Sequence, residues 1–188
     1  MSGEPATAAP AARVRLFYAF WPDEAIRARV SAAAAVVADG MRMVPRANYH
    51  VTVAFIGAVS RSKIEVLRQI GRGQRAPRLV LRFDAYEYWP KPEVLVAAAH
   101  DIPRPLTDLW QTLHRDLAAA EFVLTPKSLR PHVTLARHIA QAPALPALLP
   151  FAWHATELCM VRTDTAGTDT AGTGSLYTVV DSWPLLDK

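Results

Sequence analysis

The chain of 188 residues is long enough to bury a substantial hydrophobic core without disulfides or a structural metal. Hydrophobic residues make up 51% and charged residues 20%, which excludes a largely disordered chain, and the net charge of +4 suits an anionic partner such as RNA without being specific for one. The single cysteine, Cys159, excludes an internal disulfide and a cysteine-based zinc cluster, and we expect it to be a small buried residue.

The N-terminal residues 1–12 contain an acid, two prolines and no basic residue, which does not match a signal peptide and predicts a disordered tail. The apolar stretch 141–161 is interrupted by three prolines, a histidine and a glutamate, so it cannot span a bilayer. These features predict a cytoplasmic protein without membrane contact, and a monomer is the simplest expectation for its oligomeric state.

Hydrophobic periodicity predicts the secondary structure along the chain. In order, we expect a strand at 14–20, a helix after Pro22, a strand at 51–57, a helix at 62–70 opened by a capping box (Ser62 and Glu65), strands at 79–89 and 93–99, a helix from Pro105 with a buried leucine stripe (Leu106, Leu109, Leu113, Leu117), and strands at 132–137, 151–162 and 176–183. Helices alternate with antiparallel-looking hairpins, which predicts an α+β fold. Because no glycine-rich loop follows a strand, a dinucleotide site or a P-loop is not supported.

Two segments have unusual composition. Between residues 61 and 82, seven of the eight charged residues are basic, and this segment is either a solvated helix and loop or a phosphate-facing patch. Residues 163–175 form a near-perfect five-residue repeat without large apolar side chains, which predicts a flexible loop.

The most informative feature is a four-residue motif that occurs twice. His50-Val51-Thr52-Val53 and His132-Val133-Thr134-Leu135 each begin a predicted strand. Residues i and i+2 of a strand share a face, so each copy places a histidine beside a threonine hydroxyl. If the copies face each other, one imidazole can hold a proton while the other lacks it, and the hydroxyls can bind a tetrahedral anion. Two imidazoles and two hydroxyls in this arrangement are suited to acid–base phosphoryl transfer without a metal.

The two motifs resemble the HxTx motifs of the 2H phosphoesterase superfamily, and in particular its bacterial RNA 2′,3′-cyclic phosphodiesterase group, the LigT-like 2′–5′ RNA ligases. The similarity extends over residues 13 to 186 and includes Pro131 before the second histidine and Trp183-Pro184-Leu185 near the end. It implies a single bilobal domain over residues 13–188, in which antiparallel sheets of two pseudo-symmetric lobes flank a central groove. The long 163–175 loop departs from the compact turn usual in the family.

The resemblance also implies a reaction and roles. His50 would be the general acid that protonates the departing ribose oxygen, and His132 the general base that activates water. Thr52 and Thr134 would hold the phosphate oxygens. The implied substrate is RNA with a 2′,3′-cyclic phosphate end, and the implied product is a 2′-phosphate. By reversibility the same site would join a 2′,3′-cyclic phosphate to a 5′-hydroxyl in a 2′–5′ ligation, and no metal or other cofactor is implied.

Phe55 and Arg137 each lie five residues past a motif histidine, so ideal strand alternation points them away from the histidine face. A bulge could bring them to the cleft, where Arg137 would contact phosphate or a base and Phe55 would offer a stacking face. The other interpretation of Phe55 is a core aromatic residue. We assign both to substrate binding.

The remaining histidines lack the spacing of metal ligands and are expected at the surface or capped (His100, His114, His138, His154). Arg42 and Arg46 are interpreted as surface residues near the first motif, and Trp110 as part of the core. Two other functions remain open. One is a 2H phosphodiesterase acting on a small cyclic nucleotide or a 2′–5′ oligoadenylate; the other is a non-catalytic RNA-binding module that uses residues 61–82, which leaves the duplicated motif unexplained.

Overall fold

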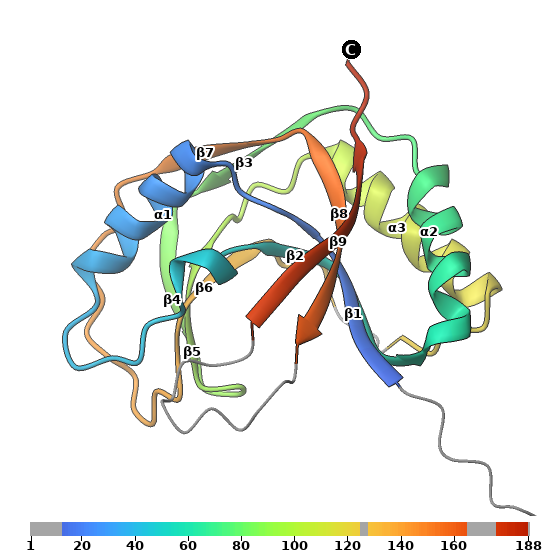
Figure 1. Ribbon diagram of the computed structural model, residues 1–188. Helices are drawn as coiled ribbons and strands as arrows, with labels where there is room; N and C mark the ends of the chain where they lie inside the picture. The colour runs from blue at the N-terminus through green and yellow to red at the C-terminus, as the bar shows by residue number, and fades with distance from the viewer. Residues whose placement is uncertain (1–12, 125–127, 165–175, 188) are drawn as a thin grey trace, which may run out of the picture.

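The computed structural model describes residues 13–124, 128–164 and 176–187 (Figure 1). In chain order it contains β1 (Arg13–Phe20), α1 (Glu24–Val36), the 3₁₀ turn η1 (Arg46–Asn48), β2 (Val51–Ser60), the 3₁₀ turn η2 (Arg61–Lys63), α2 (Ile64–Gly73), β3 (Leu79–Phe83), β4 (Ala85–Trp89), β5 (Val94–Ala98), α3 (Arg104–Ala119), β6 (His132–Arg137), β7 (Phe151–Ala155), β8 (Glu157–Asp164) and β9 (Leu176–Pro184). The predicted tail and residues 165–175 of the predicted loop lie outside the described residues. Thr163 and Asp164, also predicted in that loop, are the last residues of β8.

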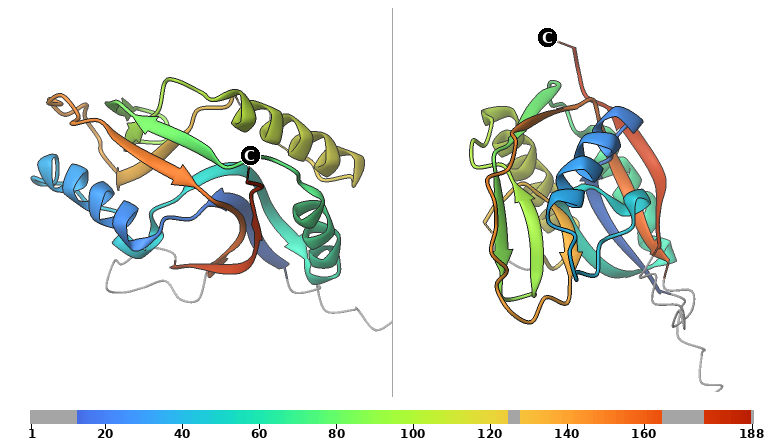
Figure 2. Two further views of the ribbon diagram at one scale, coloured as in Figure 1. Left: turned by 90° about the horizontal axis from the view of Figure 1, so that it is seen from above. Right: turned by 90° about the vertical axis from the view of Figure 1, so that its left-hand side faces the viewer.

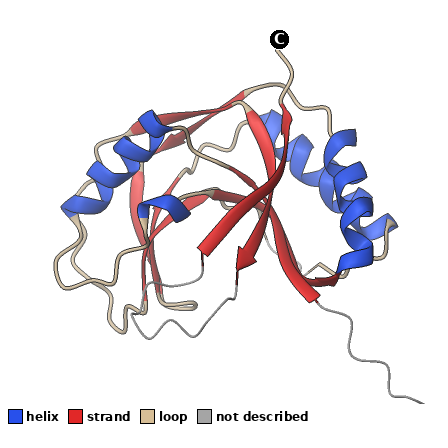
Figure 3. Ribbon diagram, in the orientation of Figure 1, coloured by secondary structure: helices blue, strands red, loops and turns tan. Residues whose placement is uncertain are grey.

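Three antiparallel sheets form the middle of the molecule and helices flank them on both sides, which confirms the predicted α+β class (Figure 3). The first sheet has the order β2-β1-β8-β9, and we call it, with α2 and α3, the first lobe. The second lobe contains the sheets β4-β5-β6 and β3-β7 together with α1. Helices α2 and α3 lie together at one end of the molecule and α1 lies at the other (Figure 2). Within the described residues, no helix combines the length and apolar character required to cross a membrane.

The two motif strands occupy equivalent places in the two lobes. The chain runs from β1 through α1 to β2, and β1 pairs antiparallel with β2 in the sheet of the first lobe, while α1 packs in the second lobe. The chain likewise runs from β5 through α3 to β6, and β5 pairs antiparallel with β6 in the second lobe, while α3 packs in the first lobe. The same strand–helix–strand order therefore places each motif histidine at the start of its strand, beside the end of a central neighbouring strand.

Side chains alternate between two faces along β1 and β5. One face packs into a core that both lobes share, and the other lies on the side of the motif histidines. Leu16 and Tyr18 on one face of β1, and Leu95 on one face of β5, belong to a single buried cluster that extends through both lobes. The opposite faces carry two small apolar clusters, one around Phe17 and one around Val96. Cys159 is buried in the first of these small clusters, as predicted, and burial raises the pKa of its thiol to about 12. The leucine stripe of α3 is also buried as predicted.

Three local predictions are wrong. The strand predicted at 151–162 is two strands, β7 and β8, which lie in different sheets because β7 pairs with β3 and β8 pairs with β1 and β9. The strand predicted at 79–89 is two strands in different sheets: β3 pairs with β7 and β4 pairs with β5, and the chain changes sheet at Asp84. The apolar alternation continues through this point, so the sequence pattern conceals the break. The capping box is absent, because η2 precedes α2, Lys63 occupies the N-cap position without a side-chain hydrogen bond, and the Ser62 hydroxyl interacts with that of Ser60.

The packing of α2 against β9 requires a glycine at position 71. A Cβ atom added to Gly71 would lie 2.3 Å from Cζ3 of the Trp183 ring, whereas one added to Gly73 meets no atom within 4 Å. We therefore expect Gly71→Ala to lower the free energy of unfolding by about 1–3 kcal/mol, since the indole must move and the gain in helix propensity is smaller. The matched Gly73→Ala should leave it unchanged or raise it by about 0.5 kcal/mol. Urea denaturation measures both, and equal effects would contradict this account of the packing.

Candidate active site

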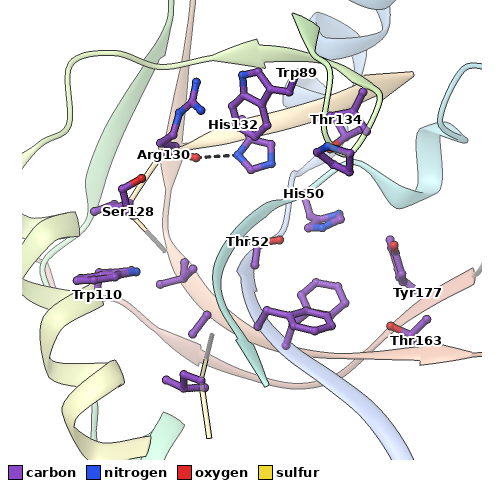
Figure 4. A pocket seen from close by; sticks show the side chains of 18 of the residues that line it. His50, Thr52, Trp89, Trp110, Ser128, Arg130, His132, Thr134, Thr163 and Tyr177 are labelled. Atoms are coloured by element: carbon purple, nitrogen blue, oxygen red, sulfur yellow. Dashed lines mark hydrogen bonds between the residues drawn. The ribbon is translucent and has the colours of Figure 1, made fainter. Parts of the chain in front are cut away.

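A cavity of about 730 Å³ lies between the two lobes and is lined by both motif strands (Figure 4). Six residues that the sequence analysis selected line this one cavity: His50, Thr52, Phe55, His132, Thr134 and Arg137. His50 precedes β2 directly and His132 is the first residue of β6, so each imidazole stands at the end of its strand nearest the cavity. The structure therefore brings together two histidine–threonine pairs that are far apart in the sequence.

The same hydrogen bond orients both imidazoles. Nδ1 of His50 donates to the Asn48 carbonyl oxygen at 2.7 Å, and Nδ1 of His132 donates to the Arg130 carbonyl oxygen at 2.7 Å. A carbonyl oxygen only accepts, so Nδ1 carries the hydrogen in each neutral ring. Nε2 is therefore the nitrogen that gains or loses a proton in both residues. This shared tautomer suits a pair in which one ring accepts a proton and the other donates one.

Aromatic rings surround His50. The ring centroid of Phe17 lies 5.0 Å from that of His50, the Tyr177 ring lies edge-on at 5.2 Å, and the Trp21 indole stacks on the imidazole at 5.9 Å. Burial among these rings lowers the pKa of His50 to about 4; the nearby charges of Arg137 and His132 act in the same direction, and the hydrogen bond to Asn48 opposes them. His50 is therefore neutral at pH 7 in this structure.

His132 has a different environment. The Trp89 indole meets its imidazole edge-on, with ring centroids 4.5 Å apart. The guanidinium of Arg130 lies over the face of this indole, 4.1 Å from the Trp89 ring centroid. Figure 4 shows Arg130 and Trp89 gathered around His132, with the hydrogen bond to the Arg130 carbonyl. His50 is thus in contact with three aromatic rings, whereas His132 contacts one indole, over which a guanidinium lies.

Equivalent irregularities in β2 and β6 explain the positions of Phe55 and Arg137. In β2, Ala19 pairs with Thr52 and Tyr18 pairs with Ala54, so Val53 is an extra residue. In β6 the register shifts in the same way between Thr134 and Ala136, and Leu135 is the extra residue. One extra residue reverses the alternation that follows it. The extra residue follows the motif threonine directly in both strands. Phe55 and Arg137, which regular alternation would point away from the histidines, therefore lie on the same face of their strands as the histidines.

Phe55 is an exposed aromatic residue, not the core residue that was the other interpretation. Its side chain is 46% exposed, and the Arg15 guanidinium lies 5.8 Å from its ring centroid. Arg137 is half-buried, and its backbone N–H donates to the Arg42 carbonyl oxygen at 3.1 Å. Both side chains reach the cavity, so an aromatic face and a guanidinium are available beside the two histidine–threonine pairs.

Several cavity residues were not identified from the sequence. Phe17, Trp89 and Tyr177 come from strands that carry no motif, and Trp110 and His114 come from α3, where Trp110 was interpreted as core. Only their spatial neighbours distinguish them, because each also fits an ordinary strand or helix pattern. The backbone N–H of Tyr177 donates to Asn48 Oδ1 at 3.4 Å, which ties β9 to the segment before the first motif.

The basic segment does not contribute to the cavity. None of the cavity-lining residues lies between positions 61 and 82. Arg68 pairs with Asp181 at 3.2 Å, and Arg78 pairs with Asp187 at 2.6 Å. Arg46 pairs with Glu24 outside the cavity. These contacts favour the solvated-surface interpretation of the segment. In the described part of the chain, no group of three or more His, Cys, Asp or Glu side chains is arranged to hold a metal ion.

Comparison with known proteins agrees with this geometry. The model of the 2′–5′ RNA ligase superfamily matches residues 16–167. The chain is 30% identical over 188 aligned positions to a Thermus thermophilus protein named RNA 2′,3′-cyclic phosphodiesterase, covering 92% of this chain and 90% of that protein. It is also 30% identical over 105 residues to the Escherichia coli protein of the same name, covering 56% of this chain and 60% of the relative.

Solved structures show the same fold. The structure of E. coli LigT complexed with 3′-AMP superimposes with a TM-score of 0.82 at 25% identity, over 93% of this chain and 99% of that chain. The structure of E. coli LigT complexed with phosphate gives a TM-score of 0.77 at 26% identity, over 92% and 98%. The family model, the relatives and the fold agree, and the chain belongs to the 2′–5′ RNA ligase superfamily of 2H phosphoesterases.

Proposed function

We propose that this protein is an RNA 2′,3′-cyclic phosphodiesterase that hydrolyses the cyclic phosphate end to a 2′-phosphate by acid–base catalysis with two histidines. The observation that carries the proposal is that both His–Thr pairs line one cavity, with Nδ1 of each imidazole fixed by a backbone carbonyl. The names of the two relatives support the substrate. We also propose that the protein acts in the cytoplasm as a monomer, as the sequence analysis expects.

In the proposed reaction, Nε2 of neutral His132 removes a proton from water as the water oxygen bonds to phosphorus. The bond between phosphorus and the ribose O3′ breaks, and protonated His50 gives its proton to O3′. The hydroxyls of Thr52 and Thr134 donate hydrogen bonds to the non-bridging oxygens, where negative charge accumulates in the transition state. Arg137 adds a positive charge at the same wall. With a 5′-hydroxyl in place of water as the nucleophile, the same steps would break the bond between phosphorus and O3′ and form a 2′–5′ linkage.

The lowered pKa of His50 sets a condition on its role as acid, because the ring must gain a proton before it can give one. The cyclic phosphate carries a negative charge, and its binding beside the ring would stabilise the imidazolium and raise the pKa. Substrate binding would therefore create the active protonation state. The neutral aromatic rings around His50 make this coupling strong, since they screen the charge poorly.

This coupling predicts how the pH profile changes on substrate binding. The kcat/KM profile reports the free enzyme, which needs one protonated and one neutral imidazole whichever ring holds the proton. We expect its acidic limb near pH 4, the pKa of His50, because below it both rings are protonated. The acidic limb of kcat should lie at higher pH, since the bound anion raises the pKa. Initial rates measured with circular dichroism at each pH test this, and an acidic limb of kcat/KM at the ordinary histidine value of about 6.5 would contradict it.

The proposed function is tested with an RNA oligonucleotide that ends in a 2′,3′-cyclic phosphate, incubated with the protein in excess EDTA. We expect conversion to a 2′-phosphate, identified by ³¹P NMR against 2′- and 3′-phosphate standards. A requirement for added metal, a 3′-phosphate product or tight RNA binding without turnover would each contradict the proposal, and the last would favour the RNA-binding module.

A mononucleotide is the competing substrate, because the E. coli relative has been solved with 3′-AMP, a single nucleotide. The same assay with a mononucleotide 2′,3′-cyclic phosphate separates the two possibilities. If the protein acts on RNA ends, kcat/KM should be higher for the oligonucleotide, since further nucleotides can contact the cavity walls. A higher value for the mononucleotide would favour the small-molecule function.

A further inference from the structure

A network of charged side chains surrounds the residues that hold His132. The carboxylate of Glu87, on β4, accepts a hydrogen bond at Oε2 from the Trp89 indole N–H at 2.5 Å and another from Arg130 Nη2 at 2.7 Å. Its other oxygen, Oε1, contacts His100 Nε2 at 2.7 Å, and His100 Nδ1 contacts Asp84 Oδ1 at 2.8 Å. One carboxylate oxygen therefore accepts hydrogen bonds from two residues, Trp89 and Arg130, that contact the imidazole of His132.

Two contacts of His132 depend on these hydrogen bonds. Trp89 supplies the ring that meets the imidazole, and Arg130 supplies the carbonyl oxygen that accepts from Nδ1. The Arg130 guanidinium also lies over the Trp89 ring, so the two residues support each other. Without the Glu87 carboxylate, the indole N–H would lose its acceptor and the guanidinium its counter-charge. The carbonyl and the ring that orient His132 would then each be less constrained.

We propose that Glu87 is a positioning residue for His132: through Trp89 and Arg130 it fixes the orientation and tautomer of the imidazole and balances the charge beside it. This inference rests on the proposed function for its effect on rate, but not for its effect on the imidazole. His50 has other neighbours: its imidazole contacts the rings of Phe17, Trp21 and Tyr177, and the Arg27 guanidinium lies 5.7 Å from the Trp21 centroid.

The charges around Glu87 support this role. Burial raises the pKa of Glu87, but the hydrogen bonds from Trp89 and His100 and the positive charge of Arg130 outweigh burial and hold the pKa below its usual range. Glu87 is therefore ionised at neutral pH. The hydrogen bonds of His100 to Asp84 and Glu87 raise the pKa of that imidazole. The charged groups that face Glu87 thus come from three segments: Asp84 before β4, His100 after β5 and Arg130 before β6.

The test substitutes Glu87→Gln, which keeps the shape of the side chain and removes its charge. Asp108→Asn is the matched control, because Asp108 lies on exposed α3 surface and pairs only loosely with Arg104, at 3.7 Å. The pKa of His132 is measured in the full chain by NMR of the imidazole Cε1–H. We expect Glu87→Gln to lower it by about 0.5, since Arg130 is left without its counter-charge near the imidazole, and Asp108→Asn to leave it unchanged.

Kinetics supply the second readout. We expect Glu87→Gln to lower kcat about tenfold, the lower part of the range typical for partners that orient a functional histidine, with a smaller change in KM. Trp89→Phe keeps an aromatic ring but removes the N–H donor, so combining it with Glu87→Gln should lower kcat by less than the product of the two single effects. The inference would be overturned if a folded Glu87→Gln protein kept both the His132 pKa and kcat of the wild type. In that case an inactive His132→Ala variant would show that the proposed function itself still holds. If the wild-type protein did not turn over RNA ends, the proposed function would fail and the NMR measurement would still decide the role of Glu87.

Discussion

Replacing either cavity imidazole, in His50→Ala or His132→Ala, is expected to lower kcat on the cyclic phosphate RNA end about a thousandfold, within the range for loss of a general acid or base. The two rings act in one proton-transfer sequence, so the double variant should be little slower than the slower single variant. KM should change much less than kcat, because neither imidazole is the main source of binding energy in the proposed mechanism. Single-turnover rates with labelled RNA measure the two single variants and the double variant.

Two further variants separate chemistry from folding. His50→Asn and His132→Asn place an amide near the position of Nδ1, so each can still donate to its backbone carbonyl, but neither can transfer a proton. They should be folded and as slow as the alanine variants. His154→Ala, at an exposed position on β7, is the control and should keep wild-type activity. Activity within tenfold of wild type in either asparagine variant would remove that histidine from the mechanism.

Removing either motif hydroxyl should have the next largest effect. Thr52→Val and Thr134→Val preserve the branched shape and remove the donor that the mechanism aims at a phosphate oxygen. We expect each to lower kcat/KM about a hundredfold, the lower end for loss of one preorganised donor to a developing anion. The effect should appear mainly in kcat, since the negative charge on these oxygens grows in the transition state. Steady-state kinetics on the same oligonucleotide measure it.

The hydroxyl itself is isolated by two comparisons. Thr52→Ser and Thr134→Ser retain the donor and should recover most of the activity. Thr156→Val changes an exposed threonine between β7 and β8 and should have no effect. If the valine variants kept wild-type kcat/KM, the threonines would be ordinary strand residues and the anion would be held by other groups.

The two histidine–threonine pairs of the cavity could be recognised from the sequence because the evidence for them is local. A histidine and a threonine two residues apart on a strand share a face whatever the rest of the chain does, and the second copy makes coincidence improbable. The α+β class and the leucine stripe of α3 also follow from short-range periodicity. The change of sheet at Asp84 could not be predicted in this way, because it depends on which strands β3 and β4 pair with, and pairing is a long-range property.

The surroundings of the two imidazoles are also long-range. Val53 and Leu135 are the extra residues of two bulges, but both are ordinary β-branched or aliphatic strand residues, and neither is a glycine that would have indicated irregular backbone. The faces of Phe55 and Arg137 could therefore be stated only as a possibility that required a bulge. Glu87, His100 and Arg130 come from three separate segments and meet only in the folded chain, so no spacing in the sequence connects them.

The central claim is that both imidazoles act on one phosphate, and the most direct test is a crystal structure with a nucleoside 2′-phosphate, the product of the proposed reaction. We expect the phosphate in the cavity between the lobes, with Nε2 of His50 and Nε2 of His132 each within about 3 Å of its oxygens. The hydroxyls of Thr52 and Thr134 should donate to the same phosphate. A phosphate that contacts only one imidazole, or that binds outside this cavity in the crystal, would contradict the account.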